Sequence, residues 1–214
     1  AQTYNDAVTL GANVTLTTTS NGDVVFASTV NGAQALTITT NGTGDVTFGD
    51  AVGGTTELTG LTITTDGFNA TSIGLGSSAA FAMTNSGAGA ITSAITGSGA
   101  TFTKAGAGTL TLSGTNTYTG ATNINAGTLT VSGSLSDSTA VTIASGATYN
   151  VNASDTVGSI AGAGTITTTA SSGLITLTAG NDGTSTTFSG ALQDGTNATL
   201  ALTKVGAGTL TLSG

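Results

Sequence analysis

The chain has 214 residues, of which 34 are Gly and only 6% are charged. Two basic residues against ten acidic ones give a net charge of −8, which excludes nucleic acid as a partner because phosphate binding requires clustered cations. Disorder is excluded as well, because Pro is absent and Val, Ile, Leu and Thr are spread evenly along the chain. Helix formers are scarce and β-branched residues are abundant, so the sequence predicts an all-β fold.

Neither a membrane segment nor a thiolate or imidazole site is expected. No run approaches the roughly 20 apolar residues that a membrane helix needs, so we expect no membrane insertion of this segment. The sequence contains no Cys and no His, which removes disulfides, zinc sites and most redox metals.

Short repeated phrases make up the first half of the chain, residues 1–101. Gly22-Asp-Val-Val-Phe26 returns as Gly44-Asp-Val-Thr-Phe48, and Leu36-Thr-Ile-Thr-Thr40 returns after a slightly longer interval as Leu61-Thr-Ile-Thr-Thr65. Units of this size are too small to bury a core of their own and must stack on one another. The repeats therefore predict a solenoid whose turns differ in length.

The second half, residues 102–214, contains a longer repeat. Phe102-Thr-Lys-Ala-Gly-Ala-Gly-Thr-Leu-Thr-Leu-Ser-Gly114 recurs almost unchanged at 202–214, and the two lysines, Lys104 and Lys204, occupy equivalent places. Within this repeat, the phrase at 108–114 is echoed at 127–133, a shorter interval than those of the first half. We divide the chain into N-terminal solenoid repeats at 1–101 and this segment at 102–214, joined in one continuous rod.

The predicted architecture is a right-handed parallel β-helix of about ten coils. Alternation in Thr109-Leu-Thr-Leu112 places Leu inward and Thr outward, and stacking at about 4.8 Å per coil gives a rod of roughly 50 Å. The residues expected to point inward are Leu110, Leu112, Leu129, Val131, Ile143 and Val151, together with Phe26, Phe48, Phe68, Phe81, Phe102 and Phe188. We expect Gly106, Gly108, Gly127 and Gly146 to be corner residues with positive φ.

An antiparallel β-sandwich is the alternative architecture. Asn21-Gly22, Asn31-Gly32 and Asn41-Gly42 could each close a type I′ hairpin. The near-identical phrases favour the solenoid, because identical side chains gain most when they stack in register.

The segment at 104–133 closely resembles the autotransporter-associated β-strand repeat of bacterial surface proteins. It has the Lys-x-Gly-x-Gly-Thr-Leu opening, the Asn-x-Tyr-x-Gly centre and the Asn-x-Gly-Thr-Leu close of that repeat. The first 101 residues resemble, more loosely, the repeats of filamentous-haemagglutinin-like adhesins. The repeat residues that we single out are Lys104, Gly106, Gly108, Leu110, Leu112, Tyr118, Gly127 and Leu129, with Lys204, Gly206, Gly208 and Leu210 in the second copy.

The resemblance implies a passenger stalk displayed outside a Gram-negative cell, that is, an extracellular or cell-surface location. We therefore interpret the chain as a non-catalytic stalk or fibre segment of an exported adhesin. Enzymatic β-helices need carboxylates beside basic groups, whereas Asp45, Asp50 and Glu57 have no Arg or His to assist them.

Two other binding functions remain open. A glycan or surface-binding module could use outward Thr and Asn faces, with Tyr4, Tyr118 and Tyr149 as sugar platforms. An ice-binding solenoid could use Thr-x-Thr units, which are Thr15-Leu16-Thr17, Thr37-Ile38-Thr39, Thr62-Ile63-Thr64, Thr109-Leu110-Thr111 and Thr128-Leu129-Thr130. The unequal coil lengths argue against a regular planar lattice, and outward Thr is also a favourable strand residue in its own right.

Calcium is the one ion that the sequence leaves open. Asn181-Asp182-Gly183, Asp23 and Asp45 place oxygen donors at turns, but the nonapeptide of calcium-bound β-rolls is absent. We expect Asp23 and Asp45 to orient turns by hydrogen bonds to the backbone instead, so that no cofactor is required.

The repeat phrases continue to both ends of the sequence. Gly214 closes a phrase that at Gly114 continues directly into the next one, and Tyr4 stands where Tyr118 stands in its own phrase. We expect both ends to expose open coil edges, so that the protein either extends further or stacks end to end with copies of itself.

Overall fold

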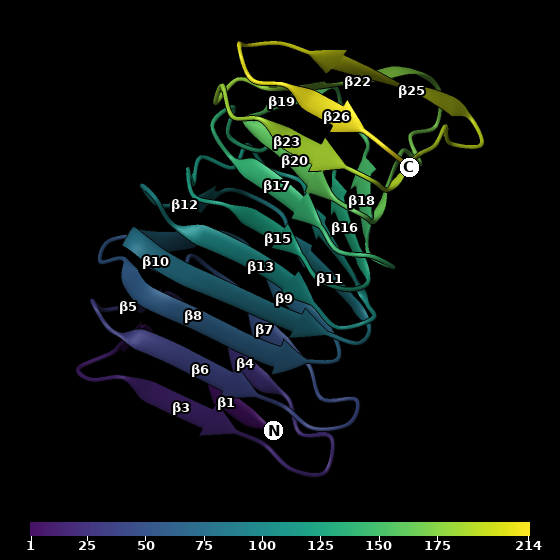
Figure 1. Cartoon of the computed structure of the whole chain (residues 1–214). Coiled ribbons are helices and arrows are strands. Elements are labelled where there is room, and N and C mark those ends of the chain that lie inside the picture. Colours follow the sequence, from purple (N-terminus) through teal and green to yellow (C-terminus); the bar gives the residue numbers. More distant parts are fainter.

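The computed structural model describes residues 1–214 and consists of 26 strands joined by turns, with no helix (Figure 1). The strands form two long sheets and a third, interrupted face. No element of the chain is a helix long and apolar enough to cross a membrane.

The first sheet has ten strands, one from each coil. They are β1 (Gln2–Tyr4), β4 (Val24–Phe26), β7 (Val46–Phe48), β9 (Phe68–Ala70), β11 (Ala88–Ile91), β14 (Thr109–Leu112), β16 (Thr128–Val131), β18 (Thr148–Val151), β21 (Thr165–Thr167) and β24 (Ala191–Leu192). Ten strands in this order are the ten coils that the sequence predicts.

The second sheet faces the first across the core and also takes one strand from each coil. Its path contains β3 (Val14–Thr17), β6 (Ala35–Thr39), β8 (Leu58–Thr65), β10 (Ile73–Asn85), β13 (Thr101–Ala105), β15 (Thr122–Ile124), β17 (Ala140–Ile143), β20 (Ser159–Gly162), β23 (Thr186–Phe188) and β26 (Leu210–Leu212). The third face is made of β2 (Val8–Thr9), β5 (Val30–Asn31), β12 (Ile95–Thr96), β19 (Asp155–Val157), β22 (Gly173–Ala179) and β25 (Ala198–Lys204).

Every strand pair in the structure is parallel, including β1 with β4, β6 with β8 and β22 with β25. Successive strands of one sheet are joined by a crossover through the other two faces, a connection that is right-handed in about 98% of parallel sheets. The parallel β-solenoid is therefore confirmed, and the antiparallel sandwich is wrong: the Asn-Gly turns lie at coil corners instead of closing hairpins. Residues 1–101 and 102–214 share both long sheets.

Coil length varies without disturbing the register of the strands. The coil that separates Thr109 from its partner Thr128 is short, the one between Val24 and Val46 is longer, and the one between Thr165 and Ala191 is longer still. The additional residues lie in the turns, because a slip of one residue inside a strand would turn its apolar side chains to solvent.

The core lies between the sheets and runs the length of the rod as one cluster of 43 buried apolar residues. The six aliphatic residues predicted to point inward, from Leu110 to Val151, are all fully buried, as are the six phenylalanines to within 2% exposure. Both predictions are confirmed.

Aromatic rings form a continuous ladder from the first coil to the middle of the rod. The rings of Tyr4, Phe26 and Phe48 are stacked, with centroids 4.6 and 5.1 Å apart. The ladder then passes to Phe68 and crosses to Phe81 on the second sheet at 6.3 Å. It continues through Phe102 to Tyr118. Ring contacts of this kind add to the burial of apolar area.

We predict that Phe48→Ala destabilises the protein by about 3–5 kcal/mol, because it removes a fully buried ring from the middle of this ladder. Denaturant unfolding measures the change. The matched control is Thr47→Ala, an outward position on the same strand, which is expected to cost about 0.5 kcal/mol or less. Equal effects of the two substitutions would contradict this account of the core.

Candidate functional site

The repeat residues come together at the corner where β13 ends and β14 begins. Lys104 lies on β13 between Met83 and Ile124 of the adjacent coils and points into the interior. Its ammonium group donates to the carbonyl oxygens of Ala105 at 2.8 Å, Gly106 at 2.9 Å and Ala126 at 3.3 Å. Each of the three protons of the ammonium group thus has a carbonyl acceptor, and Lys104 holds this corner against the adjacent coil.

Burial lowers the pKa of the Lys104 amine to about 8, because the interior disfavours the charged form. The surrounding carbonyl dipoles hold the cation in place by hydrogen bonds. Lys104 therefore links two coils and fixes the turn between β13 and β14, although its burial disfavours the protonated amine.

The glycines of the repeat have two different roles. Gly106, Gly127 and Gly146 adopt positive φ, at 77°, 64° and 81°, as expected of corner residues. Gly108 does not: it is required because a Cβ there would lie 1.9 Å from the carbonyl oxygen of Gly87 in the coil below. The expectation of positive φ at Gly108 is therefore wrong, and close approach of two backbones explains the residue.

The remaining repeat residues fill the interior. Leu110, Leu112 and Leu129 are fully buried, and the Tyr118 hydroxyl lies 2.6 Å from the Thr122 hydroxyl. Burial raises the pKa of Tyr118 well above its usual range. Because Tyr118 and Tyr149 are both enclosed, neither can serve as a sugar platform.

Lys204 begins the second copy and repeats part of this geometry. Its amine donates to the carbonyls of Val205 and Gly206, and Gly206 has a φ of 71°. A Cβ at Gly208 would lie 2.0 Å from the Thr184 carbonyl oxygen, so this glycine also marks a close backbone approach. Lys204 is exposed and Leu210 is half-buried, since no further coil of this chain covers them.

Inward polar side chains occupy the same corner in earlier coils. The Thr40 hydroxyl donates to the Gly44 carbonyl at 2.7 Å, and the Thr65 hydroxyl donates to the Gly67 carbonyl at 3.0 Å. In the next coil the Asn85 amide donates to the Gly87 carbonyl at 2.6 Å. Sequence reasoning missed this column, although the second Thr of each Ile-Thr-Thr phrase breaks the alternation of apolar and polar residues and marks it.

The acidic residues do not form a joint site. Asp23 accepts a hydrogen bond from the Asp45 backbone at 2.9 Å, and Asp45 accepts one from Gly67 at 2.8 Å, so each orients the next coil. Asp182 accepts hydrogen bonds from Ser159 and Thr184. Burial acts to raise the pKa of Asp182, but these hydrogen bonds and the charge of Lys204 outweigh it, so the pKa is lowered. No group of three or more acidic side chains that could hold a metal is present, and the expectation that no calcium is required stays a prediction.

Asp155 is the one buried carboxylate. It accepts hydrogen bonds from the backbone of Leu135 at 2.9 Å and of Thr156 at 3.0 Å. Burial raises its pKa to about 6, opposed by these hydrogen bonds and assisted by the nearby Asp137. Asn116, on an earlier coil, makes an equivalent contact: its side-chain oxygen accepts a hydrogen bond from the backbone N–H of Ile95. Asp155 is therefore a structural residue that links coils on the third face.

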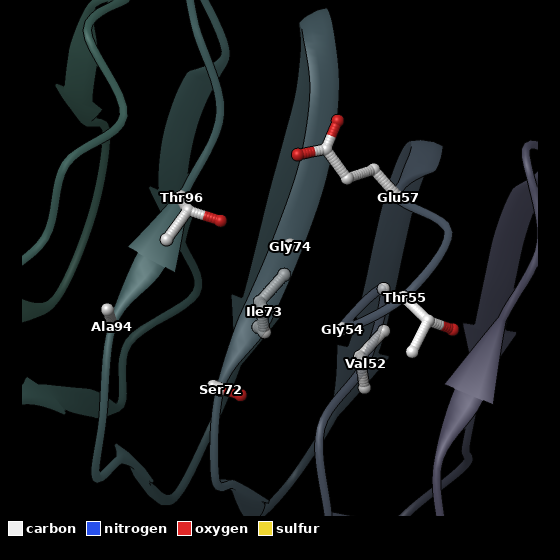
Figure 2. Close-up of a pocket in the computed structure, with 10 residues that line it drawn as sticks. Val52, Gly54, Thr55, Glu57, Ser72, Ile73, Gly74, Ala94 and Thr96 are labelled. Atoms are coloured by element: carbon white, nitrogen blue, oxygen red, sulfur yellow. The ribbon is translucent and has the colours of Figure 1, made fainter.

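The largest hollow is a groove of about 460 Å³ on the third face, beside β10 and β12 (Figure 2). Its floor includes Gly53 and Gly74, where a Cβ on Gly53 would lie 2.1 Å from the Gly74 carbonyl oxygen. Glu57 is its only charged residue, and its carboxylate extends from a loop toward β10. Asp45 and Asp50 do not line the groove, so no pair of carboxylates is assembled there.

The comparisons with known proteins agree with this geometry. Residues 102–131 and 202–214 match the family model of the passenger-associated-transport-repeat, a repeat of autotransporter passengers. No curated protein and no solved structure matches the chain significantly. The resemblance noted in the sequence is thus confirmed for the two segments that contain Lys104 and Lys204.

We predict that the free energy of unfolding rises as the pH is raised from about 8 toward 10. The folded state releases the Lys104 proton near pH 8, whereas the unfolded chain holds it until about 10.5, so in this window the unfolded state binds more protons. Above pH 10 the burial of Tyr118 and Tyr149 acts in the opposite direction, since burial raises the pKa of both hydroxyls.

Chemical denaturation at several pH values checks this prediction. In Lys104→Met the rise between pH 8 and 10 should disappear. Lys204→Met removes an exposed amine from the equivalent place and should keep the rise. A Lys104→Met protein with the full pH dependence would show that another group is responsible.

Proposed function

We propose that this chain is a non-catalytic rod segment of an exported surface passenger. The passenger repeat at 102–131 and the parallel β-solenoid support this function together. The groove beside Glu57 supports it too, because a lone carboxylate offers no acid and base pair for glycoside cleavage.

The use of the repeat residues is the observation that carries this proposal. Lys104 ties a corner to the next coil, Gly108 lets two backbones meet, and Leu110 fills the interior. All three are used in stacking one coil on another, and none faces a hollow where a ligand could bind. A repeat of this kind specifies a rod, and a rod of stackable coils can be extended to any length.

Export to the cell surface or the extracellular space fits the same features. Passengers of autotransporters are the proteins in which this repeat occurs. A chain whose stability comes from successive similar coils, with no Cys, needs no disulfide formation to fold after transport. An adhesive region would lie on another part of such a passenger, and this segment would hold it away from the cell.

Display on a bacterial surface tests the proposal. The chain is placed between an export leader and the outer-membrane domain of an autotransporter in a Gram-negative host. We expect it to reach the surface as a unit that resists added protease. Gly108→Val should abolish this resistance because the new side chain meets the Gly87 carbonyl, whereas Thr109→Val, on the exposed neighbour, should not. Retention of the parent chain inside the cell would contradict export.

The partner that the terminal coils favour is another β-solenoid coil, which a second copy of this chain can supply. At the first coil, Tyr4, Val8 and Val14 are only half-buried and line an apolar cavity of about 140 Å³. At the last coil, Leu212 is 54% exposed. Unpaired parallel strands with apolar interiors are templates for a further strand.

We predict that the isolated 214-residue chain associates as its concentration rises, because both terminal coils present such edges. Multi-angle light scattering gives the mass directly. A Val14→Lys, Leu212→Lys double variant places like charges at both edges and should shift the chain toward the monomer. A parent chain that remains monomeric at millimolar concentration would refute end-to-end stacking.

A further inference from the structure

Thr-x-Thr units on β3, β6 and β8 lie directly over one another on the outer face of the second sheet. Thr15 pairs with Thr37, which pairs with Thr62. The second residue of each unit forms a parallel column, in which Thr17, Thr39 and Thr64 pair in the same way. The six side chains are half-buried or exposed, and we call them the threonine array.

The array is a regular two-dimensional net. Neighbouring coils are about 4.8 Å apart, and residues i and i+2 of one strand are about 6.7 Å apart. Thr is stiff at χ1 because it is β-branched, so each copy presents its hydroxyl and methyl groups in a similar way. Thr84 extends one column by a further coil, and Thr103 lies beyond Ala82 in the other.

The hydroxyl groups of the array are free for a ligand. None of the six makes a hydrogen bond to another group of the protein, whereas the adjacent Thr40 and Thr65 hydroxyls are bonded inside the corner. No charged residue lies on the array, and the strand positions before it are the small residues Ala35, Gly60 and Ala80. The face is therefore uncharged, hydroxyl-rich and without protruding side chains.

A second set of Thr columns, on the first sheet, behaves differently. There the Asn150 amide donates to the hydroxyls of Thr130 at 3.2 Å and Thr169 at 2.7 Å, and Thr130 is buried. Asn150 therefore replaces Thr in one column of this set, and its bonded neighbour Thr130 is buried, so the set does not present a complete net of free hydroxyl groups. Its members pair in order as Thr109, Thr128, Thr148 and Thr165, beside Thr111, Thr130, Asn150 and Thr167.

The chemistry of the array selects a ligand that is itself periodic. A single hydrogen bond to a neutral hydroxyl contributes only about 1 kcal/mol net, because water is displaced to make it. A small or flexible ligand would meet one or two of these groups, whereas a rigid lattice meets all of them at once and gains from multivalency. Crystalline water is the lattice whose every molecule both donates and accepts hydrogen bonds.

We propose that the threonine array binds ice. Its hydroxyl groups would take the places of water molecules at the crystal surface, and its methyl groups would order the water between them. The doubt raised by unequal coil lengths does not apply to this face, because the additional residues lie in turns and the strands keep their register. This activity goes beyond the rod function and does not depend on export.

Incorporation into slowly growing ice tests the proposal on the purified 214-residue chain. We expect the chain to be enriched in the ice fraction relative to a co-dissolved globular protein, and to inhibit ice recrystallisation. Thr39→Tyr, on the central strand of the array, and Thr64→Tyr, on its last strand, each place a ring on the face and should reduce enrichment to the background. Tyr is a favourable strand residue at both positions, and circular dichroism checks that each variant is folded.

Thr142→Tyr is the matched control. Thr142 is exposed on β17 of the same sheet, but its neighbours in the column are Asn123 and Ala161, so it lies outside the array. This variant should keep the enrichment of the parent. The proposal is overturned if the parent is excluded from ice, if Thr142→Tyr loses as much as Thr39→Tyr, or if the folded chain binds only crystalline cellulose or chitin.

Discussion

Parallel backbone hydrogen bonds join each coil to the next along the whole rod, and this pairing governs where every side chain lies. A spacing of about 4.8 Å forces every side chain to lie over its counterpart one coil away. Phe26 therefore meets Phe48, Thr40 meets Thr65, and Thr37 meets Thr62. The ring ladder of the interior, the hydrogen bonds of the corners and the Thr columns of the outer face all result from this stacking of like residues.

Polar groups inside the rod follow from this constraint. A corner must bring the backbone from one sheet to the next, and its carbonyl groups cannot all pair with a neighbouring strand. Thr40, Asn85 and Lys104 supply the missing donors from within. Lys104 is the costly member of the column because its charge is buried, and the three carbonyls around it offset part of that cost.

The outer faces are where coils can differ without harm to the stack. Turn length varies from coil to coil, the third face bends into a groove near Glu57, and the threonine array occupies one wall. Rod and array are compatible because they use opposite sides of the same strands: Leu36 and Ile38 point inward while Thr37 and Thr39 point outward.

The amino-acid sequence alone predicts the parallel stack, its number of coils and its inward apolar residues, because period-two alternation and near-identical phrases are local patterns that place like residues in register when coils stack. It also marked the passenger repeat, which depends on local motifs. It could not give the burial of Lys104, the close approach at Gly108 or the closure of Thr130 by Asn150, since each involves a group one coil away. These contacts form only when the coils stack, because the register between coils depends on the number of residues in each turn, and no single repeat specifies that number.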